Sequence, residues 1–320
     1  MENKKKPTIV FMGTPDIASI VLESLCLENY PILAVVTQPD YISKNKKEAL
    51  VSPVKRMALE KNIPIIQPDK LDNEFKEWLE KIKPDLLIVV AFGKIIPKKI
   101  LDIPKFKSLN IHASMLPKLR GASPIQNALA NGMAETGITV MLMDEGIDTG
   151  DILSQKSVAI DPQDNYLTLT GKLAVTASSL LLKTIPSWIE GTSSPQKQDH
   201  SQATMCQLIE KSDGQISWSE NADEIYNKFR AFHVWPGIFT FWENKENLQK
   251  LSLNEISVQK NKLGEKHHLG EVFQYTPSQI GVQTNSGVII LDKIQLAGKN
   301  ETLIDDFLNG YPNFIGSILK

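Results

Sequence analysis

The sequence is poor in cysteine and has no long apolar run. Its only two cysteines, Cys26 and Cys206, have no C-x-x-C or histidine partner nearby, which argues against a disulfide framework or a cysteine-based metal site. Apolar runs such as 86–91 and 177–182 are much shorter than the roughly 20 residues that a membrane helix needs. The basic N-terminus leads into no signal-peptide core. We therefore expect a cytoplasmic protein that binds no metal and has no membrane anchor.

The chain also has no large excess of positive or negative charge. The formal net charge of the chain is −2, and residues 205–320 contain 11 Lys or Arg against 14 Asp or Glu. Basic residues gather instead at Lys44, Lys46 and Lys47, and again between residues 98 and 120. Because the distribution of charge matters more for binding than its sum, these clusters permit a polyanionic partner without requiring one.

The first half of the chain alternates apolar runs with stretches of helical spacing. We expect strands at 8–12, 32–37, 64–67, 86–91 and 108–112, and helices at 17–28, 54–61 and 73–82. This alternation predicts a Rossmann-like α/β domain whose mostly parallel sheet is covered on both faces. A single glycine, Gly13, follows the first strand, whereas a dinucleotide fingerprint needs three, so NAD is a weak candidate.

Two further apolar runs, 137–143 and 152–160, are joined by a short glycine-containing loop and are expected to pair antiparallel at one edge of the sheet. A long amphipathic helix then ends the first domain at residue 189, and the small polar residues 190–204 are typical of a linker. Short strand-like runs within 205–320 predict a small OB-like β-barrel as the second domain.

The stretch from Asn110 to Gly121, N-I-H-A-S-M-L-P-K-L-R-G, begins where a strand is expected to leave the sheet. In open α/β sheets, ligands bind at the carboxyl ends of the strands. Asn110 and His112 are two residues apart, so on a strand both side chains project from the same face. An amide donor beside a group that titrates near neutral pH suits addition to a carbonyl. Ser114 has no G-x-S-x-G elbow around it, so a serine nucleophile is not favoured.

An acidic loop, Asp144–Asp151, joins the two antiparallel runs. It lacks the twelve-residue spacing and the flanking helices of an EF-hand, so calcium is not favoured. Two interpretations stay open. Either the loop is a solvated hairpin turn, or one of its aspartates approaches His112, fixes the orientation of the ring and stabilises its charged form.

These segments also carry a family resemblance. The runs V-F-M-G-T-P-D-I-A, P-D-L-L-I-V-V-A-F-G-K-I-I-P, N-I-H-A-S-M-L-P-K-L-R-G-A-S-P-I-Q, M-D-E-G-I-D-T-G-D and R-A-F-H-V-W-P-G follow one another along nearly the whole chain. In this order they resemble the methionyl-tRNA formyltransferase family. The N-x-H pair with a downstream D-x-G-D is similar to that of all folate-dependent formyltransferases, and W-P-G narrows the resemblance to the branch that acts on tRNA.

The resemblance implies formyl transfer from the co-substrate 10-formyltetrahydrofolate to the α-amino group of initiator methionyl-tRNA. At the matching positions it implies that Asn110 stabilises the oxyanion, that His112 assists proton transfer and that Asp148 holds the histidine. It further implies a folate-binding loop whose backbone meets the pteridine, made of Ser114, Met115, Leu116 and Pro117. We expect the enzyme to be a monomer.

In two places the chain departs from the family pattern. One is the slight acidic excess of residues 205–320, where a tRNA-binding barrel is expected to show a basic stripe, and the other is a loop. Where the family has the basic, glycine-rich loop P-D-R-P-A-G-R-G-K, this chain has P-D-Y-I-S-K-N-K-K-E-A. Lys44, Lys46 and Lys47 remain available to contact the acceptor stem, but lysine does not offer the bidentate phosphate contacts of arginine. The alternative acceptor is a small amine or a nucleotide sugar. A noncatalytic folate- or RNA-binding module is a further alternative.

Overall fold

A computed structural model describes residues 6–42, 49–260 and 267–320. The chain folds into two compact units: unit 1 comprises Met1–Ile125, Ala134–Ile160 and Thr168–Gln207, and unit 2 comprises Gln126–Met133, Asp161–Leu167 and Leu208–Lys320. The bounds interleave because helices α5 (Pro124–Ala130) and α6 (Tyr166–Ile189) each contribute residues to both units. Lys44, Lys46 and Lys47 lie outside the described residues.

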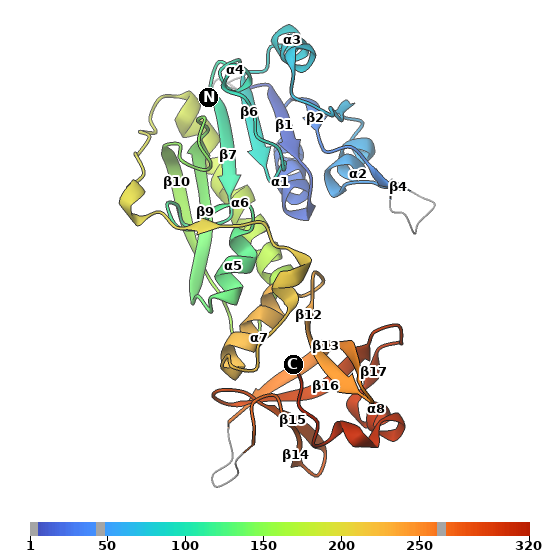
Figure 1. The fold of residues 1–320 in the computed structure, drawn as a ribbon. Coiled ribbons are helices and arrows are strands. Elements are labelled where there is room, and N and C mark those ends of the chain that lie inside the picture. Colours follow the sequence, from blue (N-terminus) through green and yellow to red (C-terminus); the bar gives the residue numbers. More distant parts are fainter. Residues whose placement is uncertain (1–5, 43–48, 261–266) are drawn as a thin grey trace. The chain divides into compact units, whose positions relative to one another are not determined.

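Unit 1 is built on a seven-stranded sheet with the strand order β10-β9-β7-β6-β1-β2-β5 (Figure 1). The strands are β1 Ile9–Gly13, β2 Ile32–Val36, β5 Ile65–Ile66, β6 Leu86–Val90, β7 Ser108–His112, β9 Glu135–Leu142 and β10 Ile152–Ala159. Strands β1, β2, β5, β6 and β7 run parallel to one another, whereas β9 and β10 are antiparallel to their neighbours. The predicted mostly parallel sheet with an antiparallel edge is therefore confirmed.

The central strands β1 and β6 are apolar at every position, with no alternation of apolar and polar residues, and all their residues are buried. This pattern is typical of a parallel sheet that is covered on both faces. On one face, Val10 and Met12 of β1 pack with residues of α3 (Asn73–Ile82) and α4 (Lys98–Leu101). Ile9 and Phe11 project to the opposite face and are also fully buried. Helix α1 (Asp16–Leu27) contacts β1 and β6, and α2 (Pro53–Glu60) contacts β2 and β5.

The start of α2 shows how local sequence fixes an element. The Ser52 hydroxyl accepts a hydrogen bond from the Lys55 backbone N–H at 3.1 Å, and Pro53 occupies the first helical turn. A serine cap followed by proline is a favoured helix start, because the cap satisfies a free N–H and proline needs no partner. The helix expected at 54–61 is thus present, at Pro53–Glu60.

The segment 190–207 packs within unit 1. Ile152 and Gln196 exchange two backbone hydrogen bonds of 2.8 Å each. Strand β11 (Met205–Cys206) pairs in parallel with β8 (Arg120–Gly121), and a short 3-10 helix, His200–Gln202, lies between these two contacts in the chain. The polar residues that are typical of a linker therefore include a segment with fixed partners. The domain boundary at 190–204 stays a prediction.

Unit 2 contains a curled, antiparallel six-stranded sheet of the half-barrel type, as expected for a small OB-like domain (Figure 1). Its strands are β12 Ile238–Asn244, β13 Asn247–Gln259, β14 Val272–Thr276, β15 Gln279–Gln283, β16 Val288–Leu296 and β17 Thr302–Leu303, and its helices are α7 Ala222–Ala231 and α8 Ile304–Gly310. Trp242 is fully buried and makes edge contacts with Phe307 and Phe314. Aromatic edge contacts of this kind add to the stabilisation from burial.

The remaining short elements are a hairpin of β3 (Tyr41–Ile42) and β4 (Ala49–Leu50) in unit 1, and two 3-10 helices, Lys211–Gly214 and Pro312–Phe314, in unit 2. Among the helices of the described residues, none is both long enough and apolar enough to cross a lipid bilayer.

Candidate active site

Strand β7 carries Asn110 and His112 to its carboxyl end, between the neighbouring strands β6 and β9. Asn110 is 9% exposed and His112 is 6% exposed, so both polar side chains are largely removed from water. Buried polar groups require partners. Both find one in the same residue, Asp148, which lies in the loop between β9 and β10.

Asp148 links three parts of unit 1. Its Oδ1 accepts a hydrogen bond from Asn110 Nδ2 at 3.3 Å, and its Oδ2 accepts one from the Gly121 backbone N–H at 2.9 Å. The same Oδ2 lies 3.5 Å from His112 Nδ1. Asp148 has a left-handed backbone, with φ at +53°, which costs a non-glycine residue on the order of 1 kcal/mol or more. The surrounding contacts hold this loop in a conformation that aims the carboxylate at the strand end.

His112 has an acceptor near each ring nitrogen. Nε2 lies 2.8 Å from the carbonyl oxygen of Leu119, which can only accept, so Nε2 carries a hydrogen. In the neutral ring the lone pair is then on Nδ1, on the side of the Asp148 carboxylate. With the lone pair on Nδ1, no hydrogen lies between this nitrogen and Asp148 Oδ2, and the 3.5 Å separation is longer than a charge-assisted hydrogen bond. Nδ1 is thus the ring nitrogen that can accept a proton, and it lies on the side of the Asp148 carboxylate.

One of the two side-chain amide hydrogens of Asn110 has no acceptor among the described residues. Its side-chain nitrogen has two hydrogens, and within the part of the chain that the structure describes it donates only to Asp148. The second hydrogen is therefore available to a ligand. A donor held in advance beside a developing negative charge stabilises an oxyanion without reorganisation.

Ser114, Met115, Leu116 and Pro117 form a turn fixed to the antiparallel edge of the sheet. The Ser114 carbonyl accepts from the Thr139 hydroxyl at 2.7 Å, which in turn accepts from the Leu116 N–H at 3.1 Å. Gln155 donates to the Leu116 carbonyl at 2.8 Å. These backbone groups are already used within the protein. Ser114 is fully buried, whereas Met115 is partly exposed and its N–H has no hydrogen bond to the described residues, so the Met115 N–H is the donor that this turn can offer a ligand.

The structure also shows two residues near the site, Arg120 and Gln198, whose burial and contacts were not expected from the sequence. Arg120, considered above only as part of a basic cluster, is 5% exposed and donates to the side chain of Gln198. Gln198 is itself buried, although it belongs to the polar segment that is typical of a linker. Its partners are backbone carbonyls of the Asp148 loop, which leave no signal in the sequence.

Cys206 is adjacent to the site, and its surroundings disfavour the thiolate form that a nucleophile needs. Burial raises the pKa of its thiol, and the negative charge of Asp148 raises that pKa as well, against an opposing backbone hydrogen bond from Ser123. The thiol is thus held protonated at neutral pH and contacts the Arg120 carbonyl oxygen at 3.2 Å.

Gly150 is required for the shape of the Asp148 loop. A Cβ at this position would lie 1.7 Å from the carbonyl oxygen of Leu142, so Gly150→Ala forces the backbone to move. Because Asp148 is two residues away, we expect kcat to fall by about 100-fold, as for a displacement of about 1 Å at a reacting group. Steady-state kinetics of the purified variant test this. Gly171→Ala, where the added methyl meets nothing within 4 Å, is the control, and wild-type kcat for Gly150→Ala would contradict the expectation.

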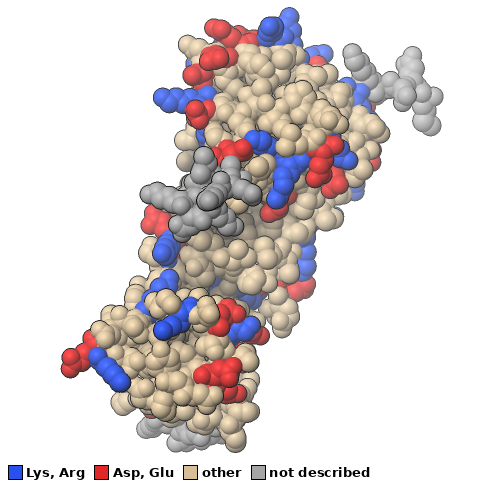
Figure 2. All heavy atoms as spheres, turned by 90° about the vertical axis from the view of Figure 1, so that its right-hand side faces the viewer, with Lys and Arg blue, Asp and Glu red and all other residues tan. Residues whose placement is uncertain are grey.

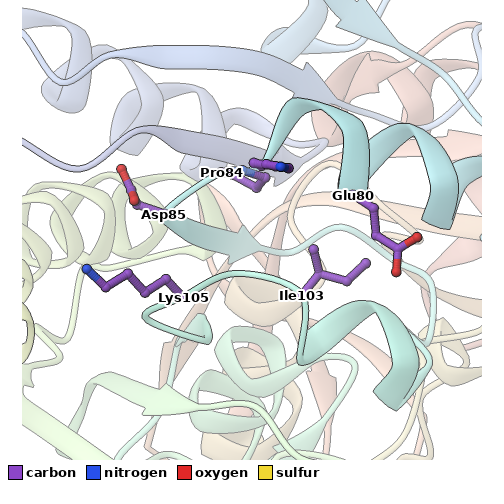
Figure 3. A pocket seen from close by; sticks show the side chains of 6 residues that line it. Glu80, Pro84, Asp85, Ile103 and Lys105 are labelled. Carbon is purple, nitrogen blue, oxygen red and sulfur yellow. The ribbon is translucent and has the colours of Figure 1, made fainter.

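A surface hollow of about 530 Å³ lies elsewhere in unit 1 (Figure 3). It is lined by Glu80, Lys83, Pro84, Asp85, Ile103 and Lys105. Pro84 and Asp85 precede β6, so the hollow is at the amino end of that strand, whereas Asn110 and His112 lie at the carboxyl end of the adjacent parallel strand. Ligands of such sheets bind at the carboxyl ends, so we do not assign the hollow to the reaction.

Comparisons with known proteins match both halves of the chain. Residues 6–185 match the model of the formyl transferase family, and residues 208–312 match the model of the formyl transferase C-terminal domain. A methionyl-tRNA formyltransferase of Caldicellulosiruptor saccharolyticus is 44% identical over 98% of this chain and 99% of its own length. One from Staphylococcus aureus is 39% identical over 96% of this chain and 97% of its own length.

Solved structures share the fold at lower identity. The N-formyltransferase of Helicobacter canadensis, in complex with folinic acid and dTDP-3-aminofucose, is 20% identical with a TM-score of 0.64, over 89% of this chain and 98% of its own. HypX of Aquifex aeolicus, in complex with tetrahydrofolic acid, is 14% identical with a TM-score of 0.65, over 98% of this chain and 48% of its own. The sequence matches and the shared fold together assign this chain to the formyl transferase family, among the methionyl-tRNA formyltransferases.

Proposed function

We propose that this enzyme transfers the formyl group of 10-formyltetrahydrofolate to the α-amino group of initiator methionyl-tRNA. The observation that carries the proposal is the convergence of Asn110, His112 and Asp148 at the carboxyl end of β7, in a chain of this family. An amide donor, a proton acceptor and a carboxylate are the groups that addition to a formyl carbon requires.

In the proposed reaction, the neutral amine of methionyl-tRNA attacks the formyl carbon. A C–N bond forms, and the formyl oxygen becomes an oxyanion that accepts the second amide hydrogen of Asn110. The attacking nitrogen gives a proton to His112 at Nδ1, and Asp148 stabilises the charged ring. When the bond between the formyl carbon and N10 of the folate breaks, that proton passes to N10. The products are formylmethionyl-tRNA and tetrahydrofolate.

For the folate, the turn of Ser114, Met115, Leu116 and Pro117 is the proposed contact. It adjoins the end of β7, and the N–H of the partly exposed Met115 has no partner among the described residues. This donor suits the polar edge of a pteridine ring. We expect folate to be bound by this backbone together with the side chains of the turn.

For the tRNA, we propose unit 2 as the second contact region, with the active site of unit 1 taking the aminoacylated end. Basic and acidic side chains are interspersed on the face drawn in Figure 2, which fits the slight acidic excess of residues 205–320. Arg120 is buried and is not part of a phosphate-binding surface, whereas Lys118 is exposed. With the three groups of the site supplied by one chain, we further propose that the enzyme is a monomer that works in the cytoplasm.

The alternative acceptor, a small amine or nucleotide sugar, is tested against tRNA in one assay. Enzyme is incubated with 10-formyltetrahydrofolate labelled in the formyl group, and with charged initiator methionyl-tRNA or a nucleotide-linked amino sugar. We expect label on the tRNA and none on the sugar. Label on the sugar alone would favour the alternative, and the absence of label on either acceptor, under conditions in which folate binds, would favour a noncatalytic binding module.

A further inference from the structure

Gln198 uses its whole side-chain amide to connect Arg120 with the Asp148 loop. Its Nε2 donates to the backbone carbonyl of Asp148 at 2.9 Å and to that of Gly150 at 2.7 Å. Its Oε1 accepts from Arg120 Nη2 at 2.6 Å and from Arg120 Nε at 3.2 Å. Gln198 is 6% exposed, so water does not replace these contacts readily.

The two carbonyls that Gln198 binds lie on either side of Thr149, in the part of the loop where the backbone is unusual. The backbone at Asp148 is left-handed, with φ at +53°, and Gly150 lies so close to the Leu142 carbonyl that no Cβ fits there. A conformation of this kind persists only when neighbouring contacts hold it. Gln198 supplies two such contacts to the peptide groups themselves, so it fixes the direction in which the Asp148 side chain leaves the backbone.

The contacts form a closed ring around Asp148. Arg120 is followed by Gly121, whose N–H donates to the Asp148 carboxylate at 2.9 Å. Gln198 holds the backbone of Asp148 from the other direction and is itself bound by Arg120. The Asp148 carboxylate is therefore bound directly by Gly121, and the Asp148 backbone is linked through Gln198 to Arg120, the adjacent residue of the short strand β8.

We propose that Gln198 is a positioning residue for formyl transfer, which acts through Asp148 and does not touch the substrates. The proposal rests on the function proposed above. Glutamine suits this position because it presents an acceptor to a guanidinium and two hydrogens to two carbonyls at the same time. Glutamate would keep the acceptor but would place an oxygen against two carbonyl oxygens.

Gln198→Glu is therefore the most informative variant. Its carboxylate can pair with Arg120, which favours folding, while repulsion from the carbonyls of Asp148 and Gly150 displaces the loop. We expect kcat for formylation of methionyl-tRNA to fall by about 10- to 100-fold, with KM for both substrates nearly unchanged, because the loss concerns positioning in the transition state. Gln196→Glu is the matched control, since it makes the same change two residues earlier on an exposed side chain. Its kcat should stay at the wild-type value.

A double-mutant cycle separates positioning from a general structural role. In an Asp148→Asn background, Gln198→Glu should lower kcat by less than about threefold, because the group through which Gln198 acts is already lost. An equal loss in both backgrounds, or wild-type kcat for Gln198→Glu alone, would overturn the proposal. If Asp148→Asn itself had no effect, the proposed role of Asp148 would fail instead. Gln198→Met, which keeps the length of the side chain without its donors, replaces the glutamate variant if that variant does not fold, and the same outcomes apply.

Discussion

Asn110→Ala is expected to lower kcat for formyl transfer by on the order of 100- to 1000-fold, the usual loss when one oxyanion donor is removed. The reason is the amide hydrogen of Asn110 that Asp148 does not use. That hydrogen interacts more strongly with the oxyanion than with the neutral formyl oxygen, so its loss affects kcat more than KM. Steady-state kinetics with 10-formyltetrahydrofolate and methionyl-tRNA measure both constants.

The Asn110 variant also deprives Asp148 of one hydrogen bond, and this indirect effect is controlled by measuring thermal unfolding in parallel. Asn73→Ala removes an exposed amide from the first turn of α3 and is expected to keep the wild-type kcat. A loss of less than about threefold for Asn110→Ala would show that the amide is not an oxyanion donor, since one such donor is worth far more.

Asp148→Asn is expected to lower kcat by at least about 100-fold with little loss of stability. For comparison, replacing the buried aspartate of a Ser-His-Asp triad by asparagine lowers kcat by about 10⁴-fold. An amide has one acceptor oxygen where the carboxylate has two, so it cannot accept from both Asn110 and Gly121 in the present geometry. It also lacks the negative charge that stabilises protonated His112. Proton transfer and the orientation of Asn110 are thus impaired together.

Glu145→Gln is the matched control for Asp148→Asn. It removes one negative charge from the same loop, but the Glu145 side chain is 67% exposed and its contact with Lys98 is a surface ion pair. Such pairs contribute little, so the control should retain its activity and its unfolding temperature. Equal losses in the two variants would mean that the charge of the loop, rather than the position of Asp148, determines the rate.

Much of unit 1 could be predicted because its elements are determined by local patterns. The central strands are apolar runs without alternation, and Ser52 with Pro53 begins a helix at the expected place. The period of two residues along a strand was enough to put Asn110 and His112 on one face. These features depend on neighbours in sequence, so the sequence alone expresses them.

The choice of aspartate could not be predicted from pattern alone. Asp144, Asp148 and Asp151 share one loop, and only the left-handed backbone at Asp148 and the close approach at Gly150 determine which side chain faces His112. Family resemblance supplied the expectation for Asp148. The geometry is consistent with that expectation, and the catalytic role remains a prediction.

Gln198 was missed for a related reason. Its segment has the composition of a linker, and its hydrogen bonds are made to backbone carbonyls 48 and 50 residues away in the chain. Every residue has a backbone carbonyl, so the sequence does not indicate which carbonyl the Gln198 side chain binds. Arg120 illustrates the opposite problem, because a charged residue in a basic cluster suggests a solvent-exposed side chain, whereas this one is buried against Gln198.

The central claim is that Asn110, His112 and Asp148 act as one unit in formyl transfer. The most direct test is the single-turnover rate of formyl transfer to methionyl-tRNA for the variant that combines Asn110→Ala, His112→Ala and Asp148→Asn, compared with the three single variants and the wild type. For groups that act together, the losses are not additive. We predict that the combined variant is about as slow as the slowest single variant and still binds folate. A rate near that of the wild type, or a loss equal to the product of the three single losses, would contradict the account.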